Sequence, residues 1–256
     1  MNDPKQTGGT RISIFLSKYW GAIALILAWQ LWVSLGELNA VVVPGPVAVA
    51  ADIFFNPGLY VRNGAETFLV AVAGLIAGFV AGVLIAIAAW ASRILNGLLT
   101  PLGLVFSSIP VVALIPIIAR LLGYDISTVI AIVAISAFFP TFIFAGSGLQ
   151  SLPAGSSDLF RVMGASRWQT FLRLVLPSAV PNIMIAIRLI APEAVLAAIL
   201  AELLMGTSGL GFLFREASSR FAMDRAFGTS IIATIISVTC FGLALAAERA
   251  VARRWK

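Results

Sequence analysis

Histidine is absent from this chain of 256 residues, and cysteine occurs once, at Cys240. Without histidine the chain lacks the commonest general base and the commonest metal ligand of proteins. A single cysteine excludes an intramolecular disulfide, and its position inside an apolar run is typical of a buried, unreactive thiol. We therefore expect no catalytic residue, no metal site and no cofactor.

Charged residues are also scarce. They make up 11% of the chain, whereas hydrophobic residues make up 60%, and the mean hydropathy is +1.03. Soluble domains carry about 25% charged residues. This composition excludes a soluble globular protein and predicts an integral membrane protein that is surrounded by the lipid bilayer.

Six apolar stretches approach or exceed the roughly 20 residues that a helix needs to cross the hydrocarbon core. Because lipid offers no hydrogen-bond partners to the backbone, each stretch is expected to be helical. The stretches are residues 19–36, 67–90, 100–119, 128–150, 178–204 and 226–247. We predict an all-α integral membrane protein with six transmembrane helices in residues 19–247, a cytoplasmic N-terminal tail in residues 1–18 and a cytoplasmic basic tail in residues 248–256.

With six spans, alternate loops face opposite sides of the membrane, and the lysines and arginines are divided unequally between the two sides. One side holds eleven of them, namely Lys5, Arg11, Lys18, Arg93, Arg161, Arg167, Arg173, Arg249, Arg253, Arg254 and Lys256, and the other holds five, namely Arg62, Arg120, Arg215, Arg220 and Arg225. Cytoplasmic loops carry the excess of such residues. Both termini and the polar segment 158–177 are therefore expected in the cytoplasm, and the net charge of +6 reflects membrane orientation rather than nucleic-acid binding.

Glycine and proline mark two of the apolar stretches. Gly74, Gly78 and Gly82 recur at a spacing of four, which lets helix backbones approach closely in a membrane. Their partner is a helix of the same chain or a second copy, and the first alternative is favoured. Pro110 lies near the middle of stretch 100–119, where it frees a backbone carbonyl that must be surrounded by protein or water. That stretch either lines a cavity or is simply kinked.

The stretch 178–204 carries Arg188, Pro192, Glu193 and Glu202. Ionisable residues inside a membrane usually face the bundle interior or a pathway. Arg188 and Glu202 lie near the ends and are expected to reach the interface, whereas Glu193 either pairs with Arg188 or faces a wet cavity. The candidate substrate-pathway residues are Ser107, Ser108, Pro110, Ser136, Pro192 and Glu193.

The polar segment 158–177 cannot lie in hydrocarbon, because its arginines would each cost a few kcal/mol there. Gly164 is expected to end a short helix and Ser166 to begin a second one that carries Trp168. The resulting helix–glycine–helix hairpin either docks into a groove of a partner protein or lies on the lipid headgroups.

The hairpin resembles the cytoplasmic coupling loop of bacterial ABC importer permeases. The resemblance rests on an acidic residue, a glycine and an aliphatic-x-Leu-Pro sequence, which here are Asp158, Gly164, Leu174, Leu176 and Pro177. Further segments resemble the nitrate/sulfonate/taurine branch of that family. They are Pro44-Gly45-Pro46, residues 108–116, residues 164–168, Ala201-Glu202 and Gly209-Leu210-Gly211. One departure is Asp158-Leu159-Phe160, where the family usually has Glu-Ala-Ala.

This resemblance implies a type I ABC importer-like fold that forms the substrate pathway by alternating access in the bacterial cytoplasmic membrane. The implied partners are cytoplasmic ABC ATPase subunits, an extracytoplasmic substrate-binding protein and a second permease copy or paralogue. The chain itself has no Walker A sequence, so ATP hydrolysis is expected on a partner. Within the coupling loop 153–177, the implied ATPase-coupling residues are Asp158, Gly164, Ala165, Ser166, Arg167, Trp168, Leu176 and Pro177.

The implied substrate is a small organic molecule. A sulfonate, nitrate or taurine-like anion would be repelled by Glu193 if that residue faces the pathway, so a neutral, aromatic or cationic compound such as a vitamin precursor is the other expectation. The alternative function is a secondary transporter that works without an ATPase. Such transporters are commonly built from internal repeats, and none is visible in this sequence.

Overall fold

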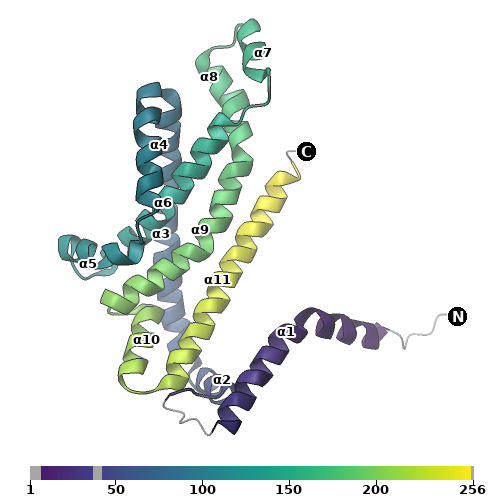
Figure 1. Cartoon of the computed structure of the whole chain (residues 1–256), viewed down its shortest axis with the longest axis vertical. Helices are drawn as coiled ribbons and strands as arrows, with labels where there is room; N and C mark the ends of the chain where they lie inside the picture. Colours follow the sequence, from purple (N-terminus) through teal and green to yellow (C-terminus); the bar gives the residue numbers. More distant parts are fainter. Residues whose placement is uncertain (1–6, 37–41, 255–256) are drawn as a thin grey trace, which may run out of the picture.

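The computed structural model describes residues 7–36 and 42–254, and this part of the chain contains helices and no strand (Figure 1). The predicted all-α class is therefore confirmed. The helices are α1 (Thr7–Leu35), α2 (Pro46–Phe55), α3 (Pro57–Ala91), α4 (Arg93–Ser107), α5 (Val111–Leu122), α6 (Ile126–Gln150), α7 (Ser156–Val162), α8 (Arg167–Thr170), the π-helical turn η1 (Phe171–Val175), α9 (Leu176–Met205), α10 (Gly209–Ser219) and α11 (Met223–Ala252). Residues 1–6 of the predicted N-terminal tail and residues 255–256 of the basic tail lie outside the described residues.

Four helices are long and apolar enough to cross a membrane. They are α3, α6, α11 and a continuous helix Arg167–Met205 that contains α9. They coincide with the second, fourth, fifth and sixth predicted stretches. The first predicted stretch falls in α1, whose apolar part Ile23–Leu35 is shorter than a full span.

The third predicted stretch is not one helix. It is divided between α4 and α5, whose axes meet at 102°, and together they make a fifth span only if the bent pair is counted as one. Pro110 lies at the break and has no N–H to continue a helical ladder. The hydroxyls of Ser107 and Ser108 donate to the Leu104 carbonyl at 2.8 and 3.2 Å. The single span predicted over residues 100–119 is therefore sharply bent at Pro110, and α5 projects sideways from the bundle (Figure 1).

Helix α6 is the centre of the bundle, because it packs against both α3 and α9. The three glycines of α3 face it. A Cβ on Gly78 would lie 2.2 Å from the Ala134 carbonyl oxygen, and one on Gly82 would lie 2.8 Å from the Thr141 Cβ. The three glycines therefore pack against a helix of the same chain, which was the favoured alternative, rather than against a second copy.

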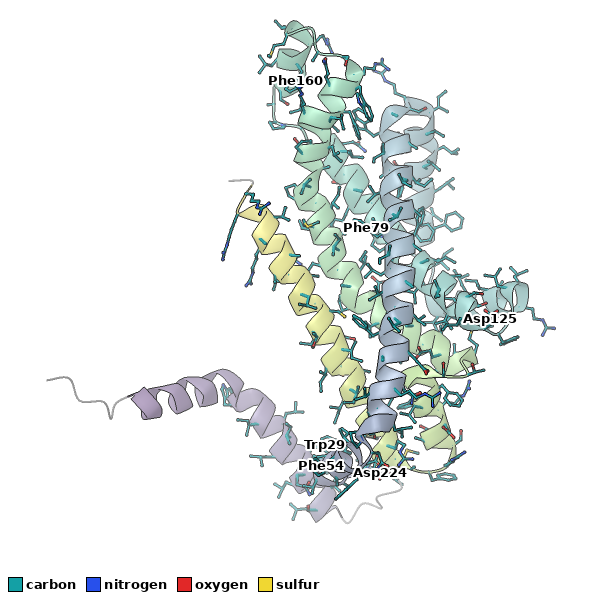
Figure 2. The ribbon with its side chains drawn as sticks, turned by 180° about the vertical axis from the view of Figure 1, so that it is seen from behind. Trp29, Phe54, Phe79, Asp125, Phe160 and Asp224 are labelled. Atoms are coloured by element: carbon teal, nitrogen blue, oxygen red, sulfur yellow. The ribbon has the colours of Figure 1, made fainter. Side chains whose placement is uncertain are left out.

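The two ends of the bundle are built differently. Phe160 lies in the α7–α8 hairpin at one end, whereas Trp29, Phe54 and Asp224 gather at the other (Figure 2). At that second end α2 is held to α11 by an ion pair of 3.0 Å between Asp52 and Arg225. Burial raises the pKa of Asp52, but the hydrogen bonds from Arg225 and Tyr60 outweigh it and bring that pKa below its usual value.

Candidate functional site

The first helix of the hairpin, α7, ends in a well-known backbone motif. Gly164 follows α7 with a φ of +72°, a left-handed conformation that a residue without Cβ adopts at no steric cost. Its N–H donates to the Arg161 carbonyl at 3.0 Å, and the Ala165 N–H donates to the Phe160 carbonyl at 3.0 Å. These two bonds form a Schellman motif, which satisfies the last carbonyls of α7. The predicted role of Gly164 as a helix end is confirmed.

Ser166 begins the second helix of the hairpin, as predicted. Its hydroxyl accepts from the Gln169 N–H at 3.2 Å, and the Gln169 side chain accepts from the Ser166 N–H at 2.8 Å. This capping box satisfies two N–H groups that would otherwise lack partners. The second helix does not end before the membrane, because α8 runs through the π-helical turn η1 into α9. Helices α8 and α9 therefore belong to one continuous helix, Arg167–Met205.

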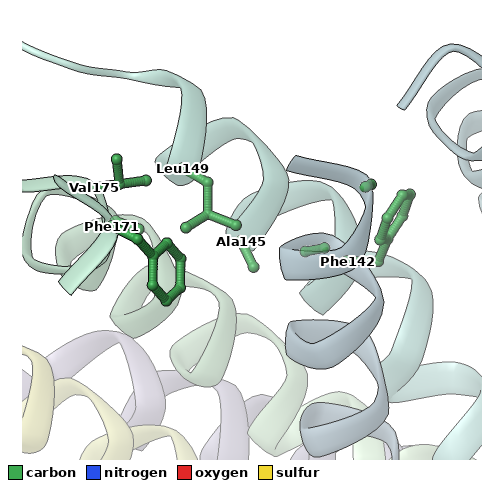
Figure 3. Close-up of a cluster of buried hydrophobic side chains, with 8 residues drawn as sticks. Phe142, Ala145, Leu149, Phe171 and Val175 are labelled. Carbon is green, nitrogen blue, oxygen red and sulfur yellow. The ribbon is translucent and has the colours of Figure 1, made fainter. Parts of the chain in front are cut away.

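Phe171 anchors the hairpin to the bundle. It is buried together with Leu149 of α6 and Val175 of η1 (Figure 3), and its ring lies 5.0 Å from that of Trp90 at the end of α3. On its other side it stacks on Trp168 at 5.6 Å. The base of the hairpin is therefore held by apolar contacts with two long helices.

The tip of the hairpin, in contrast, is open. The side chains of Leu159, Val162, Met163 and Trp168 are exposed, Val162 at 87%. Of the predicted coupling residues, Asp158 and residues 164–168 lie in this projecting part. Leu176 and Pro177 lie at the start of α9, where Leu176 packs against the buried cluster around Phe171.

Four of the predicted pathway residues meet at one cavity of about 260 Å³. Ser107 and Pro110 reach it from the bend between α4 and α5, Ser136 from α6 and Glu193 from α9. The Ser136 hydroxyl donates to the Glu193 carboxylate at 3.3 Å. A second cavity of about 540 Å³ lies among α9, α10 and α11, and it is lined by both Pro192 and Glu193. Ser108 lines neither cavity.

The sequence allows two alternatives for Glu193, a pair with Arg188 or a position beside a wet cavity, and the first is not seen in the structure. Arg188 forms an ion pair of 3.1 Å with Glu248 of α11 and does not pair with Glu193. Glu193 therefore remains next to open space, in contact with a hydroxyl group. Hydroxyl side chains of α11 lie across the second cavity from it, including Ser230, Thr234 and Ser237.

The expectation for Glu202 was wrong. It was placed at the membrane interface, but it is 3% exposed. Its Oε2 atom accepts from the Thr67 hydroxyl at 2.8 Å and from the Gly211 N–H at 3.0 Å. The Thr67 hydroxyl in turn accepts from the Leu210 N–H at 2.8 Å. The carboxylate thus holds the turn into α10 against α3, a role that only the fold reveals.

Comparison with known proteins places this arrangement in a family. A family model described as the binding-protein-dependent transport system inner membrane component matches residues 74–256. The nitrate import permease protein NrtB of Synechocystis is 30% identical to the chain, covering 88% of the chain and 83% of NrtB. The formylaminopyrimidine transport permease protein ThiX of Halalkalibacterium halodurans is 28% identical, covering 77% and 80%.

The fold is also similar to that of a solved transporter. An inward-facing structure of the MetNI methionine ABC transporter superposes with a TM-score of 0.65 at 22% identity, covering 75% of this chain and 96% of the matched chain. Together with the hairpin, the family match favours the ABC permease over the secondary transporter. The chain belongs to the binding-protein-dependent transport system inner membrane components, the permease subunits of ABC importers.

Proposed function

We propose that the hairpin is the cytoplasmic contact through which a separate ATPase drives this permease. The observation that supports the proposal is the combination of an open apolar tip with a rigid connection to the membrane. Val162 and Met163 are exposed beyond the bundle, and the capped helix α8 continues without a break into α9. A partner that displaced the tip would displace α9 with it, since a continuous helix transmits force along its axis.

The apolar tip also explains the departure from the family's Glu-Ala-Ala. Leu159 is exposed, so a larger side chain at this position is accommodated without strain in the permease itself. The added apolar area enlarges the surface available to a partner, and apolar area that is removed from water contributes about 25 cal/mol per Å². The matching groove of the ATPase is then expected to be correspondingly wider.

Gly164→Asp tests the docking role. A Cβ at Gly164 would meet no atom within 4 Å, and aspartate is one of the residues that tolerate a left-handed backbone, so the permease should fold with a charged group at the tip. We expect the variant to be inserted normally and to lose ligand-stimulated ATPase activity in the complex, because burying an unpaired carboxylate at an interface is costly.

Gly155→Asp is the matched control. Gly155 has a φ of +75°, lies at the base of the hairpin and also has no atom within 4 Å of an added Cβ. The Gly155→Asp variant has the same backbone strain and the same change of charge, but at a position away from the tip. Its complex should therefore keep its stimulated ATPase activity. Normal stimulation of the Gly164→Asp complex would contradict the docking role.

For the substrate, we propose a small neutral or cationic compound rather than an inorganic anion. Glu193 supports this choice, because it lies between two cavities and has a hydroxyl as its hydrogen-bond partner, with no cation paired to it in the described residues. A carboxylate there attracts an amino group or a hydrogen-bond donor and repels nitrate or a sulfonate. The relative ThiX is named for a formylaminopyrimidine, a compound of this chemical type.

A further inference from the structure

A basic cleft separates the hairpin from the cytoplasmic end of α3. It has a volume of about 1040 Å³, and its walls come from the α3–α4 turn on one side and from α7 and α8 on the other. Arg93 belongs to the first wall, and Arg161 and Arg167 belong to the second. The cleft is distinct from the two cavities that Glu193 lines.

The three arginines of this cleft have no counter-charge in the part of the chain that the structure describes. None of them forms an ion pair in residues 7–36 and 42–254, and no carboxyl group lines the cleft. Four other arginines behave differently, since Arg62, Arg188, Arg220 and Arg225 each pair with an acid. Three guanidinium groups that face one space without a counter-charge attract a multiply hydrogen-bonding anion.

The floor of the cleft is apolar. Ile87, Trp90 and Phe171 lie there, and Trp168 stands at its edge. Beside Arg93, the first two turns of α4 expose Ile94 at 83% and Leu98 at 55%. Tryptophan and arginine together are typical of the headgroup level of a membrane, and exposed leucine and isoleucine beside them form an apolar surface suited to acyl chains.

We propose that this cleft binds the headgroup of an anionic phospholipid. The phosphate would be held by the guanidinium groups of Arg93 and Arg161, and the acyl chains would lie along α4 over Ile94 and Leu98. An acidic segment of a protein partner would satisfy the arginines but would leave this neighbouring apolar surface unused. The proposal rests on the proposed function only for the side of the membrane, because it places the lipid in the cytoplasmic leaflet.

A lipid in this position has a mechanical consequence. It would connect the α3–α4 turn to the hairpin through one headgroup, and the hairpin is continuous with α9. Anionic lipid is then expected to stiffen the hairpin against the bundle.

Binding is measured by native mass spectrometry and by thermal unfolding of the purified full chain in detergent, with phosphatidylglycerol or phosphatidylcholine of the same acyl chains as the probe. We expect phosphatidylglycerol to bind more tightly and to raise the unfolding temperature further. The double variant Arg93→Gln/Arg161→Gln should weaken phosphatidylglycerol binding roughly 25-fold, at about a factor of five per arginine near the surface.

The matched control is Arg173→Gln/Arg254→Gln, which removes the same charge from exposed arginines that do not line the cleft. It should bind the lipid within about twofold of the unmodified chain, and Arg93→Lys/Arg161→Lys should restore most of the affinity, since both residues keep their charge. Gly164→Asp should also keep its lipid affinity. A loss of ATPase coupling can therefore be distinguished from a loss of lipid binding.

Several results would overturn the proposal. The proposal is wrong if the unmodified chain binds the two lipids equally well. It is also wrong if Arg173→Gln/Arg254→Gln loses as much lipid affinity as Arg93→Gln/Arg161→Gln. Stabilisation by inorganic phosphate that matches that of phosphatidylglycerol would identify a free anion as the ligand. If Arg93→Gln/Arg161→Gln kept its lipid affinity but lost its ATPase subunit, the cleft would be a protein contact.

Discussion

Glu193 and Glu202 lie on the same membrane helix, yet their surroundings differ in kind. The carboxylate of Glu202 accepts hydrogen bonds from Thr67 and Gly211 and is closed off from solvent. Glu193 accepts one hydrogen bond, from Ser136, and borders open space on two sides. A buried acid whose partners join separate helices stabilises the fold, whereas an acid beside a cavity is available to a ligand.

Glu193→Gln keeps the size of the side chain and removes its charge. We expect uptake of a neutral or cationic substrate by the reconstituted complex to fall about 10-fold or more, because a hydrogen bond to a charged group contributes about 1.5–3 kcal/mol. Transport of labelled candidate compounds into proteoliposomes measures the effect. Glu66→Gln makes the same change at an acid that pairs with Arg62 outside both cavities, and it should leave uptake intact. Unchanged uptake of every candidate by Glu193→Gln would refute the assignment.

At the scale of the elements, the contact between α3 and α6 depends on glycine. Gly74, Gly78 and Gly82 bring the two backbones together, and the atoms that a Cβ on Gly78 would meet are backbone atoms of Ala134, which cannot rotate away. In lipid, the apolar solvent gives no reason for two helices to associate, so close backbone packing supplies much of their attraction.

Gly78→Ala should therefore destabilise the protein by about 1–3 kcal/mol, the usual range for overpacking. In thermal unfolding of the purified protein this corresponds to about 2–4 °C for each kcal/mol. Gly242→Ala in α11 adds the same methyl group where no atom lies within 4 Å, and it should be neutral or slightly stabilising because alanine favours a helix over glycine. Similar melting temperatures for the two variants would show that the α3–α6 contact is looser than described.

At the scale of the whole molecule, the orientation in the membrane decides which end of the bundle faces the cytoplasm. The hairpin with Phe160 and the cluster with Asp224 lie at opposite ends of the bundle (Figure 2). Residues from the described part of the chain repeat the charge asymmetry. Arg93, Arg161 and Arg167 lie at the hairpin end without an ion pair in the described residues, whereas at the other end Arg225 is paired with Asp52. Positive charge marks the cytoplasmic side.

Cysteine labelling tests this orientation. In a Cys240→Ser background, Met163→Cys places an exposed thiol on the hairpin, and Ser219→Cys places one at the end of α10. We expect a membrane-impermeant maleimide to label position 219 in intact cells, and to label position 163 only after the membrane has been permeabilised. The reverse pattern would invert the orientation and remove the basis for a cytoplasmic coupling role.

Much of the hairpin was predictable, because helix ends are set by neighbours in the chain. Gly164 adopts a left-handed conformation, and Ser166 caps the helix that follows it, both through contacts within a few residues. The bend at Pro110 was suggested by proline chemistry, but its angle was not, since the angle depends on what α5 packs against. Glu202 was misplaced for the same reason, because its partner Thr67 is far away in the sequence.

The sequence by itself determined that this chain is a helical membrane protein with a polar hairpin, since hydrocarbon excludes charge and enforces helices over any long apolar run. It also determined where the first helix of the hairpin ends and where the second begins, at Gly164 and Ser166. Only the tertiary structure decided that Ser107, Ser136 and Glu193 border one cavity and that Arg93, Arg161 and Arg167 border one cleft. These groupings join residues from separate helices, and their proximity follows from how the helices pack rather than from any local pattern.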